Sequence, residues 1–392
     1  MTNIDIQQIA AEHIHPQIPS FFAVFFDHRL SVIMATMETC ANPGCDQPGT
    51  NRCSACKTTP YCGPICQTAD WEHHKEECPG HLRKMGMANL VKAKGYFSGN
   101  NLAQALRHAD IAATKLKQLK ECPVESMALN EALRCKFNAL NYMGQHRKAL
   151  ECAKEWYCLH LTKHTHPPAI DAGFALIESC IHNREFFDAV LYARTTWETL
   201  TLSRDSHIPE HLRHRFIACG AYHLSKSLFS LAQHGDMSAD EKQSSGVEAI
   251  MLARKALEIN TQLHGLEHAN FASDMLLLAQ VLAYFNDVDD DEILHLYEKT
   301  KAIFVRVEGS LSPNVAVCEG SLGISFKNRA KVAQAADAVE RFVANLELAL
   351  PHLREAARIY RIINHVDMAD QFSRDADLTE EMLQKLASVR QA

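Results

Sequence analysis

The chain repeats apolar side chains with a helical period along most of its length. From about His81 to Arg390 they return every three or four residues, and no segment alternates strictly as a half-buried strand does. The segment 293–307 shows such a stripe. Its apolar positions are Ile293, Leu296, Tyr297, Phe304 and Val307. Glycine and proline are sparse and fall between the stripes, so the pattern predicts a mainly α-helical region with short connections.

Two segments of this region are near copies of each other. Residues 263–272 and 307–316 align without gaps, 44 residues apart. Their shared positions are Gly265/Gly309, Asn270/Asn314 and Ala272/Ala316. Each pair falls where one helix is expected to end and the next to begin. Related helix starts near His166 and His207 are 41 residues apart. The polar stretch 234–245 lengthens the series, and we expect an inserted loop there.

Small residues recur where paired helices would touch. They are Gly144, Ala149 and Ala153 in one unit and Ala249, Ala253 and Ala256 in another. These segments resemble the second helix of tetratricopeptide (TPR) repeats, lengthened to roughly 40–45 residues as in kinesin-light-chain-like variants. The resemblance implies about six helix pairs stacked as an α-α solenoid. One pair cannot bury its apolar face alone, so stacking leaves a groove for a partner.

A different pattern occupies residues 40–78, where seven cysteines and one histidine form close pairs. The pairs are Cys40/Cys45, Cys53/Cys56, Cys62/Cys66 and His74/Cys78. Structural zinc takes four such donors, so eight predict two closed sites with no position for a catalytic water. A segment this short buries too little apolar surface to fold alone, and zinc supplies about 10–16 kcal/mol in small fingers. The last two pairs have i,i+4 spacing, which predicts one helical turn for each.

The second half of this segment resembles the MYND family of zinc fingers. The residues that carry the resemblance are Tyr61, Cys62, Cys66, Gln67, Asp70, Trp71, His74, Lys75 and Cys78. Spacing alone leaves the pairing of the ligands open, and the resemblance implies that the pairs interleave. The implied ligands are Cys40, Cys45, Cys62 and Cys66 for the first zinc and Cys53, Cys56, His74 and Cys78 for the second. His73 is a rival for His74, but it breaks the spacing to Cys78.

The resemblance also implies protein partners. In corepressor members of the family, the positions that match Gln67 and Trp71 line a groove for short proline-containing peptides. An aromatic side chain on a rigid scaffold is a common binding anchor, and extended proline-rich ligands need little ordering. The alternative interpretation is that Trp71 packs against the zinc knuckle or the helices that follow.

The expected domains are an N-terminal extension over 1–36, for which disorder is one interpretation, a finger over 37–80 and TPR-like repeats over 81–392. The net charge of −7 and the absence of a basic cluster argue against direct binding to nucleic acid. The apolar stretch 21–35 contains charges, so we expect no membrane span. Without a basic leader at the N-terminus, the fourteen cysteines indicate a reducing compartment, the cytoplasm or the nucleus. The seven beyond the finger are interpreted as core residues.

The sequence therefore predicts a non-catalytic scaffold that binds other proteins or peptides. The enzyme alternative is a lysine methyltransferase, since one such family joins a MYND finger, a SET domain and helical repeats. Here the helical pattern follows Cys78 almost directly, and Asn364-His365 is not followed by the Ser-Cys of that family's cofactor motif. A transcriptional regulator is the third class. A chaperone adaptor is a subtype of the scaffold, but no basic clamp for acidic tails can be placed.

Two weaker metal candidates have simpler interpretations. His160, His164 and His166 fall in a turn between repeats, where histidines are usually solvated. The acidic run 287–292 lacks the glycine and the distal glutamate of a calcium loop. Acidic residues are common at the start of a helix, and we expect a helix to begin there.

Overall fold

A computed structural model describes residues 38–119, 123–160, 167–202, 208–285, 290–336, 338–363 and 365–391. The expected extension over 1–36 lies outside these residues. The chain divides into two compact units. The first contains the described residues up to 88 and those between 114 and 125, and the second contains the described residues of 89–113 and those from 126 onward.

The finger of the first unit contains a two-stranded antiparallel sheet and a short helix. These elements are β1 (Asn51–Arg52), β2 (Pro60–Tyr61) and α2 (Pro64–His74). Asn51 pairs with Tyr61 in the sheet. The Tyr61 ring is fully buried, and its hydroxyl donates to a carboxylate oxygen of Asp70 at 2.6 Å. Sheet and helix are thereby held together around a core made largely of cysteines.

The prediction of one helical turn for each of the pairs Cys62/Cys66 and His74/Cys78 is wrong in part. Helix α2 begins at Pro64 and ends at His74, so Cys62 and Cys78 flank it. A residue before proline is driven toward extended backbone. Gly63 precedes Pro64 and is extended, and Cys78 itself precedes Pro79, the first residue of the next helix.

The rest of the described chain is helical. Helices α3 (Pro79–Ser98) and α4 (Leu102–Lys117) have residues in both units. The following helices are α5 (Pro123–Tyr142), α6 (His146–Cys158), α7 (Pro167–His182), α8 (Phe186–Leu202), α9 (Glu210–His234) and α10 (Ala239–His264). The last are α11 (Ala269–Phe285), α12 (Asp290–Glu308), α13 (Pro313–Ala335), α14 (Val339–Ile362) and α15 (Val366–Gln391).

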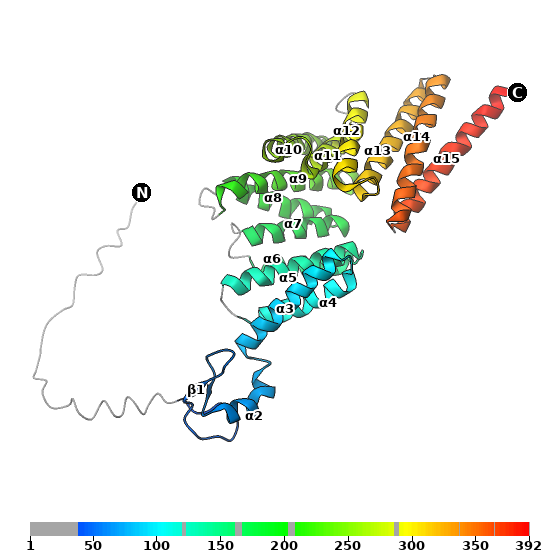
Figure 1. Ribbon diagram of the computed structural model, residues 1–392. Helices are drawn as coiled ribbons and strands as arrows, with labels where there is room; N and C mark the ends of the chain where they lie inside the picture. The colour runs from blue at the N-terminus through cyan, green and yellow to red at the C-terminus, as the bar shows by residue number, and fades with distance from the viewer. Residues whose placement is uncertain are drawn as a thin grey trace, which may run out of the picture. The chain divides into compact units, whose positions relative to one another are not determined.

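These helices form six successive pairs and a final helix. In Figure 1 the helices from α6 to α15 follow one another in chain order, and each contacts the next. Helices α7, α9, α11 and α13 also contact one another in series, so the first helices of successive pairs form one layer. The predicted fold class, a small finger followed by a solenoid of TPR-like helix pairs, is confirmed.

The two near copies fold alike. Gly265 and Gly309 end helices α10 and α12 with positive φ angles of 77° and 91°, and Ala272 and Ala316 are fully buried. The prediction of an inserted loop over 234–245 is wrong. Helix α9 runs to His234, and Ser238 starts α10 through a capping box with Glu241. The additional residues of this repeat therefore lengthen helices rather than a loop.

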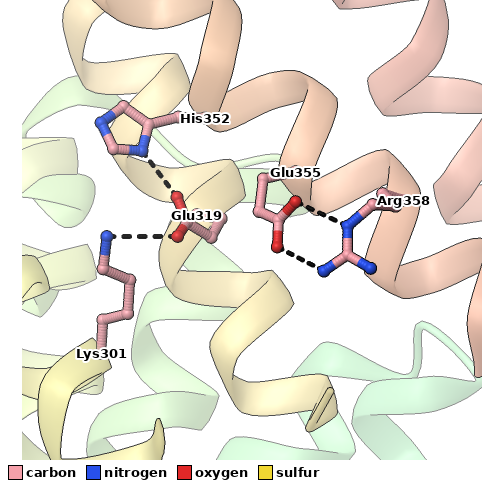
Figure 2. Close-up of polar contacts among 5 residues, drawn as sticks. All are labelled: Lys301, Glu319, His352, Glu355 and Arg358. Carbon is pink, nitrogen blue, oxygen red and sulfur yellow. Dashed lines mark hydrogen bonds and ion pairs between the residues drawn. The ribbon is translucent and has the colours of Figure 1, made fainter. Parts of the chain in front are cut away.

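One apolar core extends from Ile177 to Ala376 in the second unit, and buried charges connect its helices. In Figure 2 the Glu319 carboxylate of α13 lies between Lys301 of α12 and His352 of α14, at 3.1 and 2.6 Å. Burial opposes ionisation of Glu319, but the His352 hydrogen bond and the Lys301 charge hold its pKa below its usual range. One carboxylate thus ties three successive helices.

The cysteines beyond the finger vary in burial. Cys152, Cys180 and Cys318 are buried, Cys135 and Cys219 are partly buried, and Cys158 is exposed. Cys122 lies outside the described residues. Among the helices that the structure describes, none combines the length and apolarity needed to cross a bilayer.

Candidate metal centre and groove of the helical region

Four cysteine sulfurs meet beside the start of α2. Those of Cys40, Cys45, Cys62 and Cys66 all lie within 4.8 Å of one another. The Sγ–Sγ distances are 3.7 Å for Cys45–Cys62, 3.3 Å for Cys62–Cys66 and 3.8 Å for Cys45–Cys66. Cys66 comes from the first turn of α2, and the other three come from the irregular backbone before it.

A second group forms at the other end of α2. It brings together Cys53, Cys56, His74 and Cys78, again within 4.8 Å. The Cys53 and Cys78 sulfurs are 4.0 Å apart, and Nε2 of His74 is 3.6 Å from the Cys56 sulfur. The rival His73 is exposed and belongs to neither group. These are the two groups that the MYND resemblance implies.

The donor atoms fit two zinc ions. In a tetrahedral site with Zn–S bonds of about 2.3 Å, neighbouring sulfurs lie about 3.8 Å apart, close to the observed distances. Each group supplies four soft or borderline donors, which is a complete structural site. In the described parts of the chain, no other set of three or more histidine, cysteine or acidic side chains comes this close.

The pKa values of the cysteine thiols also indicate that each group needs a bound cation. Burial acts against ionisation of Cys56, but the Thr58 hydroxyl and nearby backbone N–H groups donate to its sulfur and lower its pKa to about 5. The hydrogen bond with Cys66 and burial raise the pKa of Cys62 to about 12, and burial raises that of Cys78 to about 11. Neighbouring thiolates repel one another, so a bound cation is needed to keep all of them deprotonated.

Polar side chains that the sequence analysis did not assign donate to the sulfurs. Asn42 Nδ2 lies 3.6 Å from the Cys66 sulfur, and Thr58 Oγ1 lies 3.0 Å from that of Cys56. Donors of this kind orient metal ligands. Asn42 and Thr58 each stand two residues after a ligand cysteine. A short polar residue at that offset is the signal that could have found them.

The two expected peptide contacts lie one turn apart on α2. Trp71 is partly exposed and packs edge-on against His74 and His81, with ring centroids 6.1 and 5.4 Å away. Gln67 is also partly exposed, and its amide is bonded to Ser54. Trp71 thus packs against a ligand histidine and against α3, and part of its surface remains accessible.

The second unit contains an open cavity of about 870 Å³. It is lined by α9, α11, α12 and α13, and none of the described side chains that line it is charged. Its polar lining includes Gln233, Gln280, Ser321, Ser325 and Asn328, and its apolar lining includes Phe229, Tyr284, Ile324 and Val332. The three amide side chains line the cavity, and no hydrogen bond within the described chain engages them. We call this surface the amide groove.

A smaller cavity adjoins the amide groove. It has a volume of about 140 Å³ and shares Phe229 and Gln280 with the larger one. Lys226 lines it, but its Nζ lies 3.0 Å from the Glu178 carboxylate, which neutralises its charge. Among the described residues, the extended surface therefore still offers no free charge to a ligand.

The MYND finger family matches residues 40–78, so this segment is a MYND finger. A similar segment occurs in ubiquitin carboxyl-terminal hydrolase 19 of Arabidopsis thaliana, 38% identical over 55 residues. The match covers 14% of this chain and 8% of that protein, so the chain spans less than a tenth of this relative. The likeness is confined to a segment about the size of the finger.

Two solved structures resemble most of the chain at low similarity. A Rap protein complexed with competence and sporulation factor has a TM-score of 0.47 and 13% identity, covering 79% of this chain and 81% of its own. A putative kinesin light chain of Podosopora anserina with TPR-like repeats has a TM-score of 0.41 and 15% identity, covering 60% and 98%. The chain therefore combines a MYND finger with a region of stacked helix pairs.

Proposed function

We propose that this protein is a non-catalytic adaptor whose finger and helical region bind different protein partners. MYND fingers and TPR-like repeats are both protein-interaction modules. The observation that carries the proposal is the amide groove, because three side-chain amides and three aromatic rings meet there on α9, α11, α12 and α13. A surface of this composition can recognise a chain segment without catalysing any reaction on it.

The chemistry of the amide groove favours an extended, uncharged peptide. Each side-chain amide offers a donor and an acceptor, as a peptide backbone does. The amides of Gln233, Gln280 and Asn328 come from three helices of one layer, so they can pair with peptide groups spaced along an extended segment. Phe229 and Tyr284, whose rings are 5.6 Å apart, form an apolar seat for one side chain. A buried carboxylate would find no unpaired cation among the described lining residues, so an acidic tail fits poorly.

The finger supplies the second proposed site. The eight residues of the two clusters are proposed to hold two structural zinc ions, and these fix α2 at both ends. Trp71 is then held by His74 and His81 with part of its ring accessible, the arrangement of a rigid aromatic anchor. Gln67 borders it one helical turn away. A short proline-containing peptide is the ligand that the family resemblance implies.

The absence of catalysis is part of the proposal. Each cluster already offers four protein donors, which leaves no position for a reacting water. A SET domain is rich in strands, whereas β1 and β2 are the strands found in the described residues. The partners are proposed to be proteins or peptides rather than nucleic acid or membrane. The cytoplasm and the nucleus are the proposed compartments.

A selection from a random peptide library tests the proposal. The full chain is immobilised as wild type, as Gln280→Ala/Asn328→Ala, as Trp71→Ala, and as Gln243→Ala, which removes an exposed amide from α10. We expect two sets of peptides, one weakened about tenfold or more by the groove variant and the other by the finger variant. The Gln243→Ala control should retain both sets. Peptides that bind all four proteins equally would refute both proposed sites.

A further inference from the structure

The side chain of Gln67 is bonded to the Cys53–Ser54 segment in three ways. Its Nε2 donates to Ser54 Oγ at 2.9 Å and lies 3.7 Å from the Cys53 sulfur. Its Oε1 accepts from the Ser54 backbone N–H at 3.4 Å. Cys53 and Cys56 form the knuckle of the second cluster, so Gln67 connects this knuckle to α2.

The orientation of the Gln67 amide follows from these partners. A backbone N–H can only donate, so the oxygen of the amide must face Ser54 N and its nitrogen must face the sulfur. Cys53 is fully buried, which leaves its sulfur without water. A donated hydrogen bond stabilises a buried thiolate and fixes its direction. Asn42 makes the corresponding contact with Cys66 in the first cluster.

We propose that Gln67 is a positioning residue for the second zinc site and that it couples this site to the first. Gln67 directly follows Cys66, a member of the first cluster, while its side chain holds Cys53 of the second. Displacement of the first turn of α2 therefore moves a ligand of one cluster and the hydrogen-bond donor of the other together. The amide that the resemblance assigned to peptide contact serves the metal site.

Zinc transfer from the full-length protein to a coloured chelator tests this proposal. In Gln67→Ala, we expect at least one zinc ion to leave about tenfold faster or more than in wild type, because loss of such a donor weakens metal binding by that order. Thr68→Ala is the matched control. Thr68 is the next residue of α2, and its hydroxyl is bonded within the helix to Pro64 O at 2.9 Å. Equal release rates for Gln67→Ala and Thr68→Ala would overturn the proposal.

The variant Gln67→Glu separates positioning from space filling. It keeps the length of the side chain and the acceptor for Ser54 N, but it replaces the donor beside the Cys53 sulfur with a negative charge. We expect release at least as fast as in Gln67→Ala, and a shifted sulfur-to-cobalt band when Co²⁺ replaces zinc. If Gln67→Glu released zinc at the wild-type rate and left the sulfur-to-cobalt band unshifted, Gln67 would only fill space and would not position the ligand.

Discussion

Asp274 of α11 is a buried acid with one neutral partner, Asn260 of α10, whose Nδ2 lies 2.6 Å away. Burial raises the pKa of Asp274 to about 7, against about 3.9 in an unfolded chain. Between about pH 4 and 7 the folded chain therefore keeps a proton that the unfolded chain has lost. The stability contributed by this group is full below about pH 4 and is lost as the pH rises through about 7.

Replacing Asp274 with asparagine should remove this pH dependence. We expect Asp274→Asn to be more stable than wild type by about 2 kcal/mol at pH 8, and to lose most of that advantage at pH 5. Urea unfolding followed by circular dichroism at several pH values measures the difference. Asp236→Asn makes the same charge change at an exposed position and should show no such trend. A constant difference between Asp274→Asn and wild type from pH 5 to 8 would contradict the assignment.

At the residue scale, the sequence identified the candidate site residues that lie close together along the chain. The candidate ligands are recognisable because soft donors paired at short spacing are typical of metal sites and rare elsewhere. The contacts of Gln67 with Ser54, and of Asp274 with Asn260, join residues 13 and 14 positions apart, with no spacing rule to indicate them. Buried acids such as Glu319 were not identifiable, because their partners come from other helices.

The turn within a helix pair recurs with one backbone shape. Asn100, Gly144 and Arg184 occupy corresponding positions with φ angles of 56°, 69° and 62°. The residue after each donates to the carbonyl five positions earlier, as in Gln145 N to Leu140 O at 2.9 Å. This is the Schellman ending of a helix, which favours glycine at the left-handed position. Of these three positions, only position 144 carries a glycine.

Opposite substitutions at two of these turns should change stability in opposite directions. Gly144→Ala is expected to cost about 1 kcal/mol, because alanine is strained in the left-handed backbone conformation of this position. Crowding adds nothing to this cost, since the added methyl group meets no atom within 4 Å. Arg184→Gly is expected to gain about 0.5 kcal/mol, since relief of backbone strain exceeds the entropy of glycine in the unfolded chain. Gly95→Ala, inside α3 and equally uncrowded, should be neutral or stabilising. Chemical denaturation measures all three, and destabilisation by Arg184→Gly would contradict the argument.

At the scale of elements, the helical period predicted the repeat region well because every helix has an apolar face. Element ends were harder to predict. The 234–245 stretch is polar, yet Ser238 and Glu241 form a capping box that begins α10 there. The prolines after Gly63 and Cys78 limit the helical turns expected from i,i+4 ligand spacing. In both cases the terminal residues determined the boundary, whereas composition or spacing suggested another one.

For the whole molecule, the two units have cores of different chemistry. The finger core consists mainly of the cysteines of the metal clusters with Tyr61 and Trp71, so it has little apolar surface beyond its ligands. The main core of the second unit is a continuous apolar cluster that includes no residue of either metal group. The finger therefore depends on zinc for its folding, whereas the helical region depends on stacking of its helix pairs.

Removal of zinc should consequently unfold the finger and leave the helical region folded. In the full-length protein, a strong chelator is expected to remove about two zinc ions per chain and to change the emission of Trp71. The helical circular dichroism signal should fall only slightly, because α2 has 11 residues and most of the helical residues lie in the second unit. A Cys53→Ser/Cys56→Ser variant should behave in the same way without chelator. Re-addition of zinc should restore the emission of the wild type but not of this variant. Loss of most of the helical signal on chelation would show instead that the solenoid requires the metal, and the two cores would then have to fold as one.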